Sequence, residues 1–218
     1  MKKKQSGFLF LFILWLSPQA ATDTNSIELG VFSKCLVHGL PYGWEKFKEI
    51  KGVSLQADSL GYCVNITSIG DVEGIGKRKE FSLKTHPWLH WRWKARVLPT
   101  DANEKIKKKN DSAAGLYVAF KGMFPFNHVI KYTWSTTLPI GAIVKSPHHG
   151  GTRAIIIQSG PGNLNTWMQE KRNVYEDYRL AFGSEPPLVE GIAIQTDSDN
   201  THSSASADFA DIVVSAHE

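Results

Sequence analysis

Charged side chains occur in two segments that alternate like β-strands. In residues 167–174 (WMQEKRNV), Glu170 and Arg172 share one face, and Asp177 follows at the beginning of a helical pattern. Arg92 lies on the polar face of HWRWKARVL. A charge within a sheet is costly unless it is paired or meets a ligand. Two interpretations follow: an ion-pair network of Glu170 with Arg92 or Arg172, or a groove that binds a polar ligand.

A carbohydrate is the ligand that fits such a groove. Sugars stack their C–H faces on aromatic rings, while acids, arginines and amides bind the hydroxyl groups. The aromatic core of a β-sandwich gives the same sequence pattern, so the alternative of buried rings stays open. The rings that could form a platform are Tyr117, Tyr132, Trp134 and Trp167. The predicted ligand-binding residues are Arg92, Asp111, Tyr117, Tyr132, Trp134, Glu170 and Arg172.

Glycan cleavage by a glycosidase or lyase is the enzymatic alternative. Hydrolysis requires two carboxyl groups roughly 5–9 Å apart, and Glu170 with Asp177 or Asp111 could supply them. The sequence contains no nucleophile elbow, Walker loop, HExxH or CxxC motif. We therefore assign no catalytic residue and expect a non-catalytic binding module ahead of an enzyme. A purely structural envelope protein is a third interpretation.

The segment TDSDNT, residues 196–201, places Asp197, Asp199 and Asn200 at the end of a predicted strand. Oxygen atoms from alternating acids are ligands of the kind that Ca²⁺ takes. The segment lacks the glycine and the distal glutamate of an EF-hand loop. The favoured interpretation is a turn in which these side chains bond their own backbone, with a calcium site as the alternative. No other cofactor is predicted.

Apolar residues recur at every second position from about residue 50 onward, which predicts roughly nine or ten short strands. Turn-rich spacers separate these strands, as in a sandwich or barrel. One helix is predicted at residues 175–183, because Tyr175, Tyr178 and Phe182 share a face and Gly183 can end the helix. The preceding residues 167–174 are expected to form a central strand.

The first 20 residues have the pattern of a secretory signal peptide. Three lysines at positions 2–4 precede an apolar run over residues 8–16 and then small residues. We predict a signal peptide at 1–20, a single domain at 21–218, no later transmembrane segment, and a periplasmic or secreted location. Removing the three lysines lowers the formal charge from +4 to +1. The remaining basic run, residues 105–109, is interpreted as a solvated loop, so no nucleic-acid partner is expected.

The two cysteines, Cys35 and Cys63, would meet an oxidising compartment after export. A disulfide between them is therefore predicted. Two free buried thiols are the alternative.

Several motifs together resemble an uncharacterised bacterial exported family, the domain of unknown function numbered 3047. They are HWRWKARVLP, NDSAAGLYVAF, IKYTWS, residues 166–201 and ASADFADIVV, and the resemblance covers residues 39–214. The family usually has two acids where this chain has Asn110 and Asp111. The last motif also looks like the closing strand of carbohydrate-binding jelly rolls. The resemblance implies an all-β fold, an antiparallel two-sheet β-sandwich of jelly-roll type with one short helix, more firmly than it implies a function.

Overall fold

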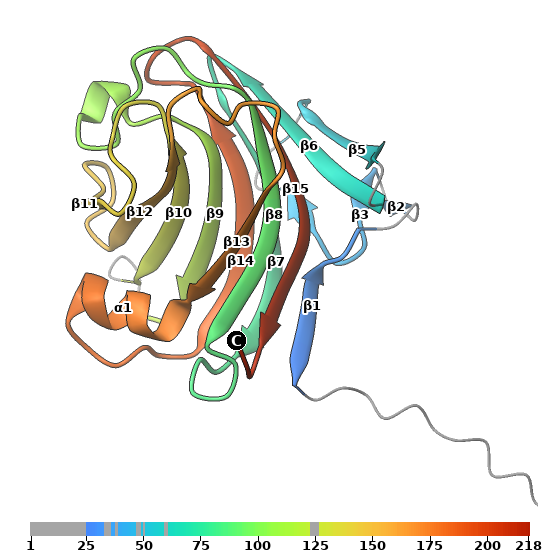
Figure 1. Ribbon diagram of the computed structural model, residues 1–218, viewed down its shortest axis with the longest axis vertical. Helices are drawn as coiled ribbons and strands as arrows, with labels where there is room; N and C mark the ends of the chain where they lie inside the picture. The colour runs from blue at the N-terminus through green and yellow to red at the C-terminus, as the bar shows by residue number, and fades with distance from the viewer. Residues whose placement is uncertain are drawn as a thin grey trace, which may run out of the picture.

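A computed structural model describes residues 25–32, 36–37, 39–46, 49, 51–58, 61–122 and 127–218. These residues form two packed β-sheets and one α-helix (Figure 1), which confirms the predicted all-β sandwich. The predicted signal peptide at 1–20 and Cys35 lie outside the described residues. The signal and the disulfide therefore stay predictions, although Cys63 is buried in the first sheet.

The first sheet has six strands in the order β13–β8–β15–β6–β5, and β1 also pairs with β15. Every pair in this sheet is antiparallel. Its strands are β1 (Ser26–Gly30), β5 (Val53–Asp58), β6 (Gly61–Ile69), β8 (Trp88–Val97), β13 (Met168–Asn173) and β15 (Ser204–Ser215). The order places β13 at an edge, so the prediction of a central strand at residues 167–174 is wrong. The chain leaves the sheet after Asn173 by turning directly into the helix.

The second sheet has seven strands in the order β11–β12–β10–β9–β14–β7–β4. Its strands are β4 (Glu45–Lys46), β7 (Val72–Phe81), β9 (Ser112–Phe120), β10 (Val129–Ser135), β11 (Ile143–Lys145), β12 (Thr152–Ser159) and β14 (Val189–Asp197). One pair, β10 with β12, is parallel, because β11 reverses the chain between them and takes the edge position. The remaining elements are β2 (Leu36–Val37), β3 (Leu40–Pro41) and the 3₁₀ turn η1 (Lys107–Lys109).

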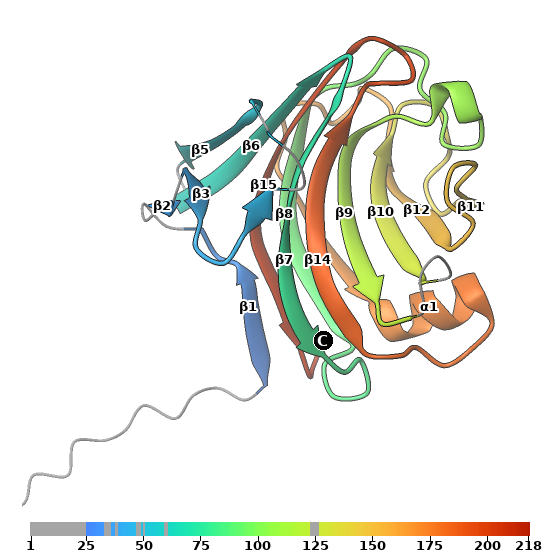
Figure 2. The ribbon, with the colours of Figure 1, turned by 180° about the vertical axis from the view of Figure 1, so that it is seen from behind.

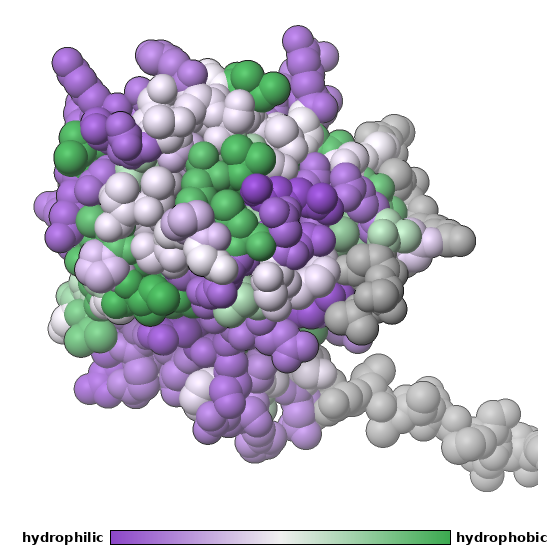
Figure 3. All heavy atoms as spheres, turned by 45° about the horizontal axis from the view of Figure 1, so that its top comes forward, coloured by the Kyte–Doolittle hydropathy of each residue, from purple (hydrophilic) through white to green (hydrophobic). Residues whose placement is uncertain are grey.

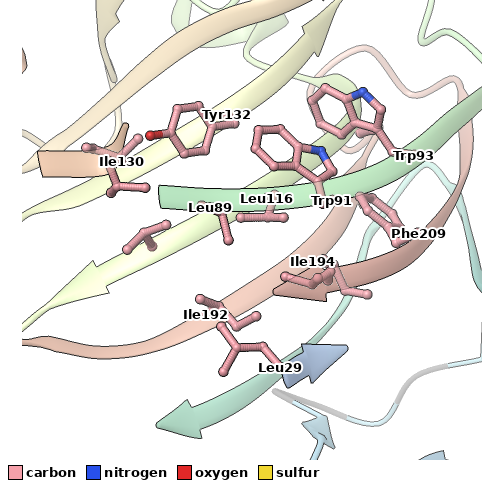
Figure 4. Packing of buried hydrophobic residues seen from close by; sticks show 14 of the residues in the cluster. Leu29, Leu89, Trp91, Trp93, Leu116, Ile130, Tyr132, Ile192, Ile194 and Phe209 are labelled. Carbon is pink, nitrogen blue, oxygen red and sulfur yellow. The ribbon is translucent and has the colours of Figure 1, made fainter. Parts of the chain in front are cut away.

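Aromatic rings from β8 and β10 fill the space between the two sheets (Figure 4). The ring of Trp91 lies 5.3 Å from that of Tyr132, and Trp93 lies 6.1 Å from Trp134, measured between ring centroids. All four side chains are at most 2% exposed. Alternation along each strand directs these rings inward and leaves the neighbouring polar residues on the outer faces. The core thus fixes which residues can reach a ligand.

The helix α1 (Val174–Phe182) confirms the helix predicted at residues 175–183, with its beginning one residue earlier. The side chain of Asn173 caps its first turn by accepting from the Glu176 amide. Tyr178 packs on Phe120 of β9, with ring centroids 4.6 Å apart, so that α1 covers the lower end of the sandwich in Figure 1. Among the described residues, no helix has the length and apolar composition required to cross a membrane.

Gly183 ends α1 in the left-handed backbone region, with φ of 70°. We expect Gly183→Ala to lower the free energy of unfolding by about 1 kcal/mol, because a Cβ is strained in this conformation. Urea denaturation measures the difference. Gly162→Ala is the control, since its added Cβ meets open space at an ordinary φ. Equal effects of the two substitutions would contradict the expectation.

Candidate ligand-binding site

A cleft of about 500 Å³ lies on the outer face of the seven-stranded sheet, the face turned away from the other sheet. It extends across β4, β7, β14 and β9, of which β7, β14 and β9 face the viewer in Figure 2. Its lining includes the small residues Gly76, Ala119, Gly191 and Ala193 and the larger side chains of Arg78, Tyr117, Glu190 and Gln195. The cleft is thus open to solvent. Its floor consists of residues with short side chains or none, and polar groups and one aromatic ring surround this floor.

The sequence of β14 explains the low floor. Ile192 and Ile194 are buried, so the residues that alternate with them face outward. The outward Ala193 lies between Gly76 of β7 and Tyr117 of β9 in the sheet register. At Gly191 a bulge brings the strands so close that an added Cβ would lie 2.5 Å from the Lys77 carbonyl oxygen. The backbone therefore requires a glycine at position 191.

Lys131 of β10 and Tyr117 of β9 are register partners on this outer face, and Tyr117 lines the cleft. The Lys131 ammonium lies 5.5 Å from the Tyr117 ring centroid, and both side chains pass over Gly115, where any Cβ would be within 3.0 Å of them. Burial raises the pKa of Tyr117. Burial by itself lowers the pKa of Lys131, but Tyr117, Asp197 and Glu104 together raise it. Lys131 is therefore a charged ammonium at neutral pH, although it is only 5% exposed.

Three acids gather where β14 ends and β9 begins. One carboxylate oxygen each of Asp111, Asp197 and Asp199 lies within 4.8 Å of the others. Asp111 accepts hydrogen bonds from the Asn200 amide at 3.1 Å and from the Thr201 amide at 2.7 Å. Burial, together with the charges of Asp111 and Asp199, raises the pKa of Asp197 to about 7 despite the attraction of Lys131. These oxygen atoms are the ones that could hold a metal ion.

The structure brings together Asp111, predicted to bind a ligand, and two acids of the segment 196–201. The segment 196–201, for which a turn was the favoured interpretation and a calcium site the alternative, brings Asp197 and Asp199 together, and the Asn200 side chain donates to Asp199. Asp111 joins them because it directly precedes Ser112, the register partner of Asp197. Calcium binding itself stays a prediction.

Sequence reasoning missed Glu104, whose carboxylate is 1% exposed and accepts from Ser135 Oγ at 2.7 Å. Burial raises its pKa, and Lys131 partly opposes this. Glu104 lies in a loop without periodicity, so no sequence signal marks it. Lys131 does carry a sequence signal, because a lysine in a strand between the buried Ile130 and Tyr132 must face the other side of that sheet.

Glu170 binds groups of the protein itself. It accepts hydrogen bonds from Trp93 Nε1 at 3.0 Å and from Gln158 Nε2 at 2.9 Å, and burial raises its pKa. Since Gln158 belongs to β12 and Trp93 to β8, Glu170 joins the two sheets along one edge of the sandwich. The charge of Arg172 lowers the pKa of Glu170, as the ion-pair interpretation implies, although no direct ion pair joins these two side chains among the described residues.

Arg172 pairs instead with Asp177 of α1. Asp177 also accepts a 2.7 Å hydrogen bond from the Tyr132 hydroxyl, and burial raises the pKa of Tyr132 well above its usual value. Tyr132 and Trp134 are both 0% exposed, so their rings are not available to stack on a sugar. The predicted aromatic platform is corrected on this point: these two rings belong to the core.

Arg92 lies on the outer face of the other sheet. It pairs with Asp211, and its guanidinium carbon lies 4.5 Å from the centroid of the partly exposed Trp167 ring. On the same face the buried Asp208 binds Lys94 at 2.9 Å and Arg96 at 2.7 Å. The predicted ligand-binding residues are therefore divided. Arg92 and Glu170 line a second cleft on the six-stranded sheet, whereas Tyr117 alone of the predicted set lines the outer-face cleft.

A family model for proteins of unknown function, DUF3047, matches residues 43–213. The chain belongs to the DUF3047 family. None of the curated proteins matches it.

Solved structures similar to this DUF3047 chain share little sequence with it. The first carbohydrate-binding module of family 27 from Caldicellulosiruptor saccharolyticus, in complex with mannohexaose, is 13% identical, with 89% of this chain and 98% of that one covered and a TM-score of 0.44. A cellulase derived from Rhodothermus marinus Cel12A is 12% identical (86% and 98% covered, TM-score 0.45). The glycoside hydrolase domain of Endo-D from Streptococcus pneumoniae is 8% identical (80% covered, TM-score 0.37), and the chain spans 22% of its length.

We expect Asp177→Ala to lower the free energy of unfolding of this DUF3047 protein by about 2–3 kcal/mol, because it leaves the buried Tyr132 hydroxyl and the Arg172 guanidinium without their acceptor. Asp177→Asn should cost less, since its amide oxygen can still accept from Tyr132. The measurement is urea denaturation followed by tryptophan fluorescence. Glu176→Ala, at the exposed neighbouring position, should change stability by less than about 0.5 kcal/mol. An Asp177→Ala variant with the same free energy of unfolding as wild type would show that the network does not contribute to stability.

The buried Asp208 should make stability depend on acid pH. Burial alone raises its pKa, but hydrogen bonds from Arg96, Asn65 and Lys94 lower it below the ordinary value. A lowered folded-state pKa gives a stabilisation that is present above the unfolded-state value of about 3.9 and is lost as pH falls below it. The stability difference between wild type and Asp208→Asn, about 2–3 kcal/mol at pH 7, should therefore shrink toward pH 3. A difference that is constant with pH would contradict this.

Proposed function

We propose that this protein is an exported module that binds a glycan in the outer-face cleft without cleaving it. The observation that carries the proposal is the cleft itself: an open volume of about 500 Å³ on a strand surface whose floor is built from glycine and alanine. Such a floor lets a flat, extended ligand approach the sheet closely. The volume falls within the range of about 300–1,000 Å³ that is typical of ligand sites.

The side chains around the floor suit sugar hydroxyl groups. Arg78 and Gln195 offer N–H donors, and Glu190 offers a carboxylate acceptor. Charge-assisted hydrogen bonds of this kind are stronger than neutral ones. The half-buried Tyr117 supplies an aromatic surface held in place by Lys131 and Gly115. Together these groups provide both elements of sugar recognition, hydroxyl partners and a ring for C–H stacking.

Glycan cleavage is the second candidate function, and one observation favours it. Two carboxyl groups near Lys131, those of Asp197 and Glu104, have pKa values raised by burial. A carboxylic acid that keeps its proton near neutral pH can serve as a general acid. Cleavage would require a bound glycosidic bond to lie between two such groups. Together with burial, the charges of both groups raise the pKa of Tyr117, which lines the cleft, so the proposal requires a direct test of turnover.

The test is binding to a glycan array, followed by calorimetry with the best oligosaccharide found. We expect Arg78→Ala and Gln195→Ala each to weaken binding roughly tenfold or more, which corresponds to about 1.4 kcal/mol per lost hydrogen-bonding group. Gln169→Ala is the matched control, because Gln169 is exposed on β13 of the opposite sheet. It should leave affinity unchanged, and all three variants should melt within a few degrees of wild type.

Three results would contradict the proposal. No glycan bound by the wild type would exclude a glycan module. Equal losses from Gln195→Ala and Gln169→Ala would place the site elsewhere. Release of reducing ends from a bound glycan, abolished by Asp197→Asn, would replace the binding module by the enzyme.

A further inference from the structure

The acidic cluster of Asp111, Asp197 and Asp199 lies outside the lining of the glycan cleft. Asp197 is the last residue of β14, Asp111 immediately precedes β9, and Asp199 belongs to the loop after β14. This end of the sandwich is uppermost in Figure 1 and is turned forward in Figure 3, where hydrophilic residues project between separate apolar patches. Three chain segments thus direct carboxylates to one point at a hydrophilic end of the molecule.

Hydrogen bonds within the cluster account for Asp111 and for the contact of Asp197 with Asp199, but they leave one oxygen of Asp197 without a donor. Asp111 accepts from two backbone amides and from the Thr201 hydroxyl at 2.5 Å, as an acid that holds a turn would. Asp197 Oδ1, by contrast, is closed off from solvent and has no hydrogen-bond partner among the described residues. A buried carboxylate oxygen without a donor is costly. This oxygen indicates that the cluster binds something other than its own backbone.

The charges at this point indicate the sign of the missing partner. Three carboxylates lie together, and Lys131 is the cation whose attraction acts on Asp197. When all three carboxylates are ionised, which for Asp197 requires a pH above its pKa of about 7 or a bound cation, they and Lys131 together carry a formal charge of −2. A divalent cation matches that charge, whereas an anion or a neutral ligand would leave the carboxylates repelling each other.

We propose that Asp111, Asp197 and Asp199 bind one Ca²⁺ ion. The donor set consists of carboxylate oxygens alone, which suits a hard cation. Two oxygens on opposite sides of Ca²⁺, each about 2.3–2.6 Å from the ion, are about 4.6–5.2 Å apart. The three acids already lie within 4.8 Å of one another. Oxygens within this limit can share one Ca²⁺ ion, whose coordination is flexible, whereas Mg²⁺ demands a near-ideal octahedron and gives up its waters reluctantly.

The proposed role of the ion is to fasten the loop between β14 and β15 to the beginning of β9. Asp199 lies in that loop, and Asp111 already holds its Asn200 and Thr201 amides. A bound ion would add a link between this loop and the end of β14. The inference does not depend on glycan binding, because none of the three acids lines the cleft.

The experiment uses the full chain after removal of metal with a chelator. Titration with CaCl₂ should give a saturable binding signal in calorimetry. The melting temperature should rise by about 5–10 °C when Ca²⁺ is present at roughly 100 times its Kd, because a ligand of the folded state stabilises it by mass action. MgCl₂ at the same concentration should give a clearly smaller shift.

Two variants separate metal binding from a structural role of the acids. Asp197→Asn and Asp199→Asn should fold without metal at least as well as wild type, since each removes one repelling charge, and both should lose most of the calcium shift. Asp101→Asn is the control, because Asp101 is exposed in the loop before β9 and takes no part in the cluster. It should keep the full shift.

The absence of a calcium shift in the wild type would overturn the proposal, as would an equal shift in Asp199→Asn. Equal responses to Mg²⁺ and Ca²⁺ would overturn the assignment to calcium. If the wild-type protein binds no glycan but its melting temperature still rises with Ca²⁺, the proposed function is rejected and the calcium site is retained.

Discussion

The packing of tryptophan and tyrosine rings from β8 against those from β10 is the interaction on which the rest of the structure depends. Trp91 and Trp93 meet Tyr132 and Trp134 between the sheets, and all four rings are essentially removed from solvent. Each such side chain buries about 150–250 Å², so this cluster supplies a large part of the hydrophobic stabilisation. Because the rings alternate with polar residues along both strands, their burial also decides what the outer faces present.

A core built from such rings brings buried N–H and O–H groups with it, and charged residues at the sandwich edge satisfy several of them. Trp93 donates to Glu170, and Tyr132 donates to Asp177. Asp177 in turn holds Arg172, which connects β13 to α1. The same charges that suggest a ligand groove in the sequence are thus partners of the aromatic core. An inward-pointing charge also suits β13 as an edge strand, since it discourages pairing with another chain.

The two outer faces differ in what they leave accessible. On the six-stranded sheet, Lys94 and Arg96 close over Asp208, and Trp167 lies against Arg92. On the seven-stranded sheet, glycine and alanine at the positions that alternate with the core keep the surface low, and the polar groups stand around this floor. The floor depends on the core: Gly191 and Ala193 face outward because Ile192 and Ile194 face inward.

The sequence by itself determined most of the strands after residue 50, the helix predicted at residues 175–183 and the shared face of Trp91 and Trp93, because these follow from periodicity and from the helix end at Gly183. Only the tertiary structure decided the order of the strands. That order places β13 at an edge, brings Asp111 to Asp197, and sets Tyr117 beside Lys131 and Gly115. The physical reason is that pairing across a sheet joins residues distant in the chain. Periodicity tells which face a side chain takes, but it carries no information about which strand lies beside it.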